Sequence, residues 1–217
     1  MSDLILVIGN KNYSSWSLRA WLTLKQTNLQ FAEVVIPLNM AATRSEILHY
    51  SPSSRVPVLL DGNIRVWESL AIGEYLAERC PTARLWPEHL EARALARAVS
   101  AEMHAGFQTL RQYMPMNCRA QLPGKGRQPG VQADIDRITA IWRTCRQHYG
   151  GRGDMLFGLF TVADAMFAPV VSRFITYGVE LDPLAKAYVD AVWSLPAMQR
   201  WVEDARGEPY TIPEEEL

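Results

Sequence analysis

The sequence predicts an α/β region followed by an all-α region, and two observations carry this prediction. Up to residue 79, short runs rich in β-branched residues alternate with amphipathic segments. From about residue 88 onward, apolar residues recur only at helical spacing. Two prolines in the segment between them favour a linker. We therefore predict domains at residues 1–79 and 88–217, joined by a linker at 80–87.

The first region contains four predicted strands and three predicted helices. The strands are expected at 4–8, 30–36, 56–60 and 64–67, and the helices at 17–28, from Thr43 onward and at 68–76. Thr43 and Glu46 have the spacing of a capping box. A tight turn at 61–63 forces an antiparallel pair, whereas the longer earlier connections allow parallel pairing. The prediction is a mixed four-stranded sheet with helices on its faces, a thioredoxin-like arrangement.

The second region is predicted to be a bundle of helices. The helices are expected at 90–113, as one long bent helix, and at 131–149, 161–177, 184–192 and 196–205. A segment rich in proline and glycine at 121–130 predicts a loop. The acidic tail at 210–217 is predicted to be frayed.

Composition excludes several classes of function. The 217 residues are 48% hydrophobic and carry a net charge of -1, so neither nucleic acid nor an anionic membrane is an expected partner. No apolar run approaches the length of a membrane span. Three cysteines and four histidines show no metal-ligand spacing, so we expect no metal. Widely spaced cysteines indicate reduced thiols in a cytoplasmic protein.

Two serines, Ser14 and Ser15, lie where the first strand passes into the first helix. The first N–H groups of a helix lack intrahelical partners and carry the positive end of the helix dipole. An anion such as a substrate thiolate is stabilised there, and a hydroxyl adds one aimed hydrogen bond. The alternative is that either serine is only an N-cap.

Two further features suggest a site for a peptide-like ligand. Pro57 stands at the start of a strand, where we expect a cis Val56–Pro57 bond and a Val56 backbone that pairs with an extended ligand. Glu68 and Ser69 open a second helix, where a carboxylate and an ammonium group can both be held. Together these charges fit a γ-glutamyl group.

Taken in order, these segments resemble the glutathione S-transferase family, most closely its zeta-like serine enzymes. The resemblance covers essentially the whole chain and rests on residues 13–19, 51–59, 68–76 and 160–165. The last segment matches a buried capping box formed by Thr161 and Asp164.

The resemblance implies a set of site residues. Alignment to the zeta-like enzymes points to Ser14 as the catalytic hydroxyl, and alignment to the delta and theta enzymes points to Ser15. The predicted glutathione-binding residues are Trp16, Arg55, Val56, Pro57, Glu68 and Ser69. Arg55 would reach the glycine carboxylate. Trp16 replaces a family cysteine, which excludes thiol chemistry there.

An electrophile pocket is predicted between the domains, on one face of the long helix. The residues expected there are Met103, His104, Phe107 and Arg111. Met103 and Phe107 suit an apolar ligand, although such residues are also typical of a core. His104 is expected to pack through a hydrogen bond, and Arg111 to bind an anionic substrate or an acid across a dimer interface.

The leading hypothesis is a dimeric glutathione transferase that conjugates glutathione to an apolar electrophile. The alternatives are a glutathione-dependent cis–trans isomerase of the maleylacetoacetate type and a non-catalytic glutathione-binding protein.

Overall fold

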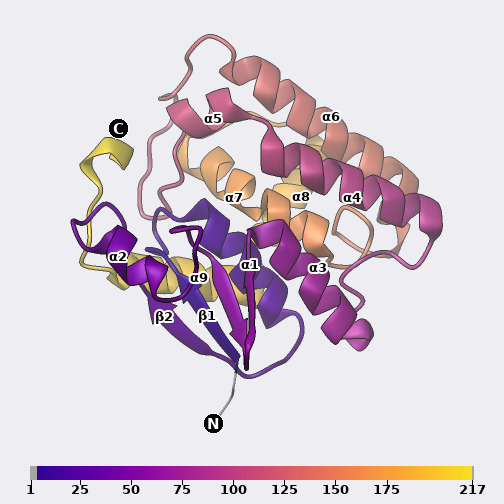
Figure 1. The fold of residues 1–217 in the computed structure, drawn as a ribbon. Helices are drawn as coiled ribbons and strands as arrows, with labels where there is room; N and C mark the ends of the chain where they lie inside the picture. Colours follow the sequence, from indigo (N-terminus) through magenta and orange to yellow (C-terminus); the bar gives the residue numbers. More distant parts are fainter. Residues whose placement is uncertain (1–3, 217) are drawn as a thin grey trace.

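The structure is a computed structural model that describes residues 4–216 (Figure 1). The elements of the first region are β1 Leu4–Ile8, α1 Ser15–Lys25, β2 Ala32–Val35, α2 Thr43–Leu48, β3 Val58–Asp61, β4 Ile64–Trp67 and α3 Ser69–Arg79. Those of the second region are α4 Leu90–Ala105, α5 Gln108–Tyr113, α6 Val131–Tyr149, α7 Val162–Thr176, α8 Pro183–Trp193 and α9 Pro196–Gly207. Residues 1–3 and Leu217, which open and close the predicted domains, lie outside the described residues.

The four strands form one mixed sheet, as predicted, and their order is β2-β1-β3-β4. β1 pairs with β2 in parallel, while β3 is antiparallel to both β1 and β4. Alternation along β1 gives the sheet two apolar faces, because Leu6 and Ile8 point into the main core and Val7 points to the other side. α1 and α3 cover the main-core face, and Ile47 of α2 covers the other.

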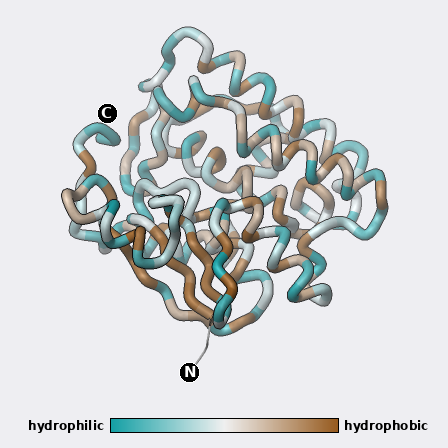
Figure 2. The backbone as a smooth tube through the Cα atoms, in the orientation of Figure 1, coloured by the Kyte–Doolittle hydropathy of each residue, from teal (hydrophilic) through white to brown (hydrophobic). Residues whose placement is uncertain are grey.

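One continuous core joins the two regions. α1 packs against both α3 and α7, and α9 returns to α1, where Trp21 and Trp201 meet edge to face with ring centroids 5.3 Å apart. The core extends from Leu4 on β1 to Ala205 on α9. Figure 2 shows the hydrophobic residues of the first region gathered along the strands. The boundaries at residues 79 and 88 stay a prediction.

Three local predictions are wrong. α1 begins two residues earlier than predicted and ends at Lys25. The predicted capping box at Thr43 is absent: Ala42 is the N-cap of α2, and Thr43 Oγ1 donates instead to the Pro37 carbonyl at 2.6 Å. The third strand begins at Val58, after Pro57.

The predicted long helix at 90–113 is two helices. α4 ends at Ala105, its C-cap Gly106 would carry an added Cβ 2.9 Å from the Glu102 carbonyl oxygen, and Phe107 takes a left-handed φ of 60°. The Arg111 guanidinium donates to the carbonyl oxygens of Met103 and His104. A side chain of α5 thereby donates hydrogen bonds to backbone carbonyl groups at the C-terminal end of α4.

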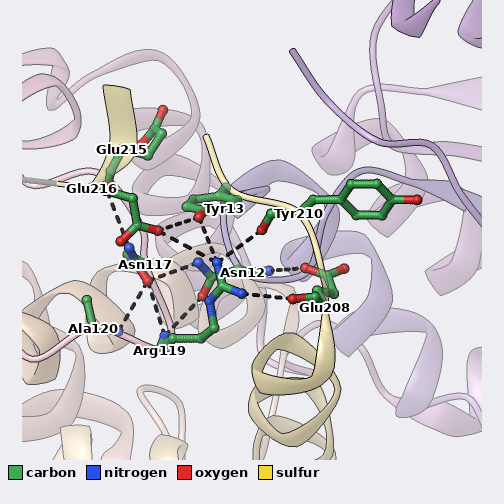
Figure 3. Close-up of polar contacts among 9 residues, drawn as sticks. All are labelled: Asn12, Tyr13, Asn117, Arg119, Ala120, Glu208, Tyr210, Glu215 and Glu216. Carbon is green, nitrogen blue, oxygen red and sulfur yellow. Dashed lines mark hydrogen bonds and ion pairs between the residues drawn. The ribbon is translucent and has the colours of Figure 1, made fainter. Parts of the chain in front are cut away.

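The C-terminal tail is docked, so the prediction of a frayed tail is wrong (Figure 3). The Glu208 carboxylate accepts the Lys11 and Asn12 N–H groups at 2.7 and 3.0 Å. Arg119 donates to the carbonyl oxygens of Glu208 and Tyr210 at 2.9 and 3.1 Å. The tail is therefore held against the loop between β1 and α1. Within residues 4–216 no helix is long and apolar enough to cross a membrane.

Candidate active site

The start of α1 uses Ser14 as its cap. Ser14 Oγ accepts the Ser17 N–H at 3.3 Å and donates to Ser17 Oγ at 2.7 Å. Ser17 Oγ in turn accepts the Gly9 N–H at 3.0 Å, which ties the helix to the end of β1. The Ser14 hydroxyl therefore already donates and accepts hydrogen bonds within the helix cap.

Ser15 and Trp16 leave donors open at the same helix start. Neither Ser15 Oγ nor the Trp16 N–H has a hydrogen-bond partner within residues 4–216. Trp16 lies in the first turn of an 11-residue helix, so its N–H has no acceptor in the preceding turn. A hydroxyl and a backbone donor at the positive end of a helix form a natural anion site.

All six predicted glutathione-binding residues line one cavity of about 320 Å³, here called the first cavity. They are Trp16, Arg55, Val56, Pro57, Glu68 and Ser69. His104, at the end of α4, lines the same cavity from the helical region. The structure therefore brings the six predicted residues together, with His104, which was predicted for the electrophile pocket, beside them.

The start of α3 supplies the charged end of the first cavity. Ser69 is 2% exposed, and its Oγ is buried without a hydrogen-bond partner within the described residues. Glu68, the N-cap residue, has a left-handed φ of 69°, and its half-exposed carboxylate lies 3.5 Å from His104 Nε2. Burial lowers the pKa of His104, and Arg19 acts in the same direction. His104 is therefore neutral near pH 7, and Glu68 is free to receive an ammonium group.

The Val56–Pro57 bond is cis, which confirms the prediction. The Val56 N–H and C=O make no hydrogen bond within residues 4–216, since β3 begins two residues later. An extended ligand can therefore pair with both groups.

A second cavity of about 440 Å³ adjoins the first and shares Trp16, Arg55 and Val56 with it. Ser14 and Ser15 belong to its lining, together with residues from segments far apart in the chain. Those distant residues include Arg111, Arg173, Ile212 and Glu215, and the neighbouring Tyr13 also lines the cavity. The helix start thus stands at the boundary between the two cavities.

The predicted electrophile pocket is only partly correct. Met103 is fully buried and Phe107 nearly so, and both belong to the core rather than to either cavity. Arg111 lines the second cavity, as its predicted role requires. The four residues share no face because the helix breaks at Gly106. Sequence reasoning missed Arg173, although an arginine in an otherwise apolar helix was an available signal.

Arginines surround Trp16. The guanidinium carbons of Arg19 and Arg111 lie 4.4 and 4.6 Å from its ring centroid, and the His104 ring meets it edge to face at 5.1 Å. Arg19 is 1% exposed, and burial holds its pKa well below the usual value. The Trp16 ring thus contacts two guanidinium groups that form no ion pair with a carboxylate within the described residues.

Comparison with known proteins identifies the family. The sequence pattern of the glutathione S-transferase N-terminal domain matches residues 13–79, and that of the C-terminal domain matches residues 128–204. A probable maleylacetoacetate isomerase from Caenorhabditis elegans is 30% identical over 173 residues, 78% of each chain. The chain belongs to the glutathione S-transferase family.

Solved structures agree with this family. A glutathione transferase homologue from Burkholderia, solved with bound glutathione, is 25% identical with a TM-score of 0.71 and covers 94% of this chain and 99% of its own. A maleyl pyruvate isomerase, described as a bacterial zeta-class glutathione S-transferase, has a TM-score of 0.73 at 21% identity and covers 96% and 100%. As a member of this family, the protein uses glutathione as its co-substrate.

Proposed function

We propose that this protein is a glutathione transferase that conjugates a glutathione thiolate to an electrophilic small molecule. The observation that carries the proposal is the open helix start, where Ser15 Oγ and the Trp16 N–H lack partners within the described residues beside a cavity lined by the predicted glutathione-binding residues.

Each end of glutathione has a matching group in the first cavity. Glu68 would receive the ammonium group of the γ-glutamyl end, and Ser69 with its helix start would hold the adjacent carboxylate. The Val56 backbone would pair with the cysteinyl part, and Arg55 would reach the glycine carboxylate. These assignments place the thiol beside Trp16, where the two cavities adjoin.

We propose Ser15 as the catalytic hydroxyl, because Ser14 Oγ already bonds within the cap. A free thiol has a pKa near 8.5, and lowering it by about two units takes roughly 2.7 kcal/mol of preferential stabilisation of the thiolate. One hydroxyl and a helix N-terminus supply stabilisation of this order. The thiolate then forms a C–S bond with the electrophile, and the leaving group departs with its electron pair.

A glutathione-dependent cis–trans isomerase of the maleylacetoacetate type is the second candidate, supported by the relative from Caenorhabditis elegans. It would use the same thiolate, which adds to a carbon–carbon double bond and leaves after rotation about that bond. Conjugation and isomerisation would use the same thiolate and differ in the electrophile that it attacks.

The experiment measures binding first and turnover second. Calorimetry with glutathione and with ophthalmate, which lacks the thiol, tests the first cavity, and the ultraviolet absorbance of the thiolate against pH tests its activation. Chlorodinitrobenzene and maleylacetoacetate then separate transferase from isomerase. Absence of glutathione binding would contradict the proposal, and thiolate formation without turnover would indicate a binding protein.

We also propose that two copies of the chain form a dimer. β4 is an edge strand of the sheet, and Ile64 and Trp67 on it are 50% and 41% exposed. Light scattering after size exclusion measures the mass directly, and a monomer at micromolar concentration would contradict this proposal.

A further inference from the structure

Two arginines that line the second cavity form no ion pair with a carboxylate within residues 4–216. Arg173 is 4% exposed, and its Nε and Nη1 donate to the carbonyl oxygens of Met114 and Pro169 at 2.8 and 3.2 Å. Its Nη2 has no hydrogen bond within residues 4–216. Burial lowers the pKa of Arg173 to about 10, so the group is charged at neutral pH.

Arg111 adds a second cation to the same cavity. Its Nε is buried without a hydrogen-bond partner within the described residues, and Nη2 donates only to carbonyl oxygens. Asp134 attracts Arg111 from a distance, but Asp134 forms no ion pair with it in the described chain and accepts the Leu110 N–H at 2.9 Å. A buried guanidinium with an open donor favours a bidentate anionic ligand.

Glu215 on the C-terminal tail is the one acid among the described residues that line this cavity. Burial raises the pKa of Glu215, and Arg173 opposes that rise. No ion pair joins the two side chains within the described residues, so the carboxylate and the guanidinium of Arg173 attract each other only at longer range.

The tail that carries Glu215 is fixed in place (Figure 3). Asn117 Nδ2 donates to the Glu215 carbonyl at 3.4 Å, and Arg119 Nη2 donates to Tyr13 Oη at 2.8 Å. Tyr13 Oη donates in turn to the Glu216 carboxylate. These contacts hold the backbone of the tail where Glu215 lines the cavity.

We propose that the second cavity binds an electrophile with one carboxylate and an apolar body, and that Glu215 determines this specificity by excluding a second carboxylate. This inference rests on the proposed transferase function. Two guanidinium groups and one carboxylate leave one positive charge for the ligand to balance. The apolar body of the ligand contacts side chains such as Leu38, Met116 and Ile212. Arg55, the other cation of the lining, is assigned to glutathione.

The test compares three benzylic chlorides that differ in charge: methyl 4-(chloromethyl)benzoate, 4-(chloromethyl)benzoate and 5-(chloromethyl)isophthalate. With saturating glutathione, we expect kcat/KM for the monoacid to exceed that for the ester about tenfold, because a charge-assisted hydrogen bond forms only with the acid. The diacid should react more slowly than the monoacid. Equal values for ester and monoacid would overturn the proposal.

Glu215→Gln tests the excluding role, with Glu214→Gln as the matched control. Glu214 is the neighbouring tail acid, accepts a hydrogen bond from Asn39 at 3.1 Å and does not line the cavity. Glu215→Gln should raise kcat/KM for the diacid about fivefold, a change of the size expected when one repulsive charge is removed, and leave the ester within twofold. Equal rises for all three compounds would instead show that the tail obstructs entry, which overturns the proposal.

Binding of inhibitors gives the same comparison without turnover. S-(4-carboxybenzyl)glutathione should bind more tightly than its methyl ester, and Glu215→Gln should favour the dicarboxylate analogue. If both glutathione conjugates bind with equal affinity, only the inferred charge preference fails. If neither these conjugates nor glutathione binds, the proposed function fails with it.

Discussion

The starts of α7 and α1 carry the same sequence signal, a hydroxyl residue before a helix, and use it differently. At α7, the Thr161 N–H donates to Asp164 Oδ2 at 2.8 Å, within the predicted capping box. The Leu156 N–H and Tyr188 Oη donate to the other carboxylate oxygen at 2.9 and 3.2 Å. At α1, the Ser14 cap satisfies its own turn and leaves Ser15 Oγ and the Trp16 N–H open.

The difference teaches that burial distinguishes a structural helix start from a binding one. Asp164 is completely buried, so each donor around it must find a partner within the protein. Ser15 and Trp16 line a cavity, where a ligand can provide the missing acceptor. Three predictions test this comparison.

Asp164→Ala should have the largest effect, and it should fall on stability. The substitution leaves two backbone N–H groups and the Tyr188 hydroxyl without their acceptor in the core. We expect a loss of about 3 kcal/mol in the free energy of unfolding. Urea denaturation measures it, with Thr161→Ser, which keeps a capping hydroxyl, as the control. An unchanged midpoint for Asp164→Ala would mean that the α7 start is not a structural cap.

Ser15→Ala and Ser14→Ala should distinguish the catalytic hydroxyl from the hydroxyl that caps the helix. Loss of the Ser15 hydroxyl should raise the pKa of bound glutathione by about one unit and lower kcat near pH 7 about tenfold, because the hydroxyl favours the thiolate over the thiol. The rate should recover at higher pH, where the thiol ionises unaided. Ser14→Ala should instead cost about 1 kcal/mol of stability as a lost cap.

Thiolate absorbance against pH and urea denaturation, measured on both variants, provide the comparison. A pKa change confined to Ser14→Ala would transfer the catalytic role to Ser14 and reverse our assignment of the two serines.

Ser69→Ala should have the smallest of the three effects. Its Oγ is buried without a partner within the described residues, so removing it costs the folded protein little. Glutathione affinity should fall about fivefold, the value of one modest hydrogen bond to the ligand carboxylate. Calorimetry measures the affinity, and the melting temperature is the control. Unchanged glutathione affinity in Ser69→Ala would show that Ser69 does not contribute to glutathione binding.

Much of the fold and of the first cavity could be predicted because their signals are local. α6 was predicted to the residue, and the mixed character of the sheet followed from the long early connections and one tight turn. The six residues of the first cavity come from three short segments of the first region, at helix and strand starts that local rules recognise. The capping box of α7 was predictable for the same reason.

The second cavity could not be predicted in the same way. The helical period continues through residues 90–113, and only the left-handed Phe107 after Gly106 shows that the helix breaks there. Because of that break, Phe107 lies in the core and Arg111 lies on a separate helix, α5. The acidic tail has the composition of a frayed end, yet Lys11, Asn12 and Arg119 hold it.

By itself, the sequence determined the two regions, the mixed sheet, and the placing of hydroxyls and Glu68 at helix starts, because each depends on residues near one another in the chain. Only the tertiary structure decided where Arg173 lies and that Glu215 lines the same cavity. Those outcomes depend on partners about 40 to 200 residues apart, such as Glu208 on Lys11, and no local pattern encodes such a contact. The helix starts in the sequence indicate where a ligand can bind. Packing between distant segments determines which ligand the site accepts.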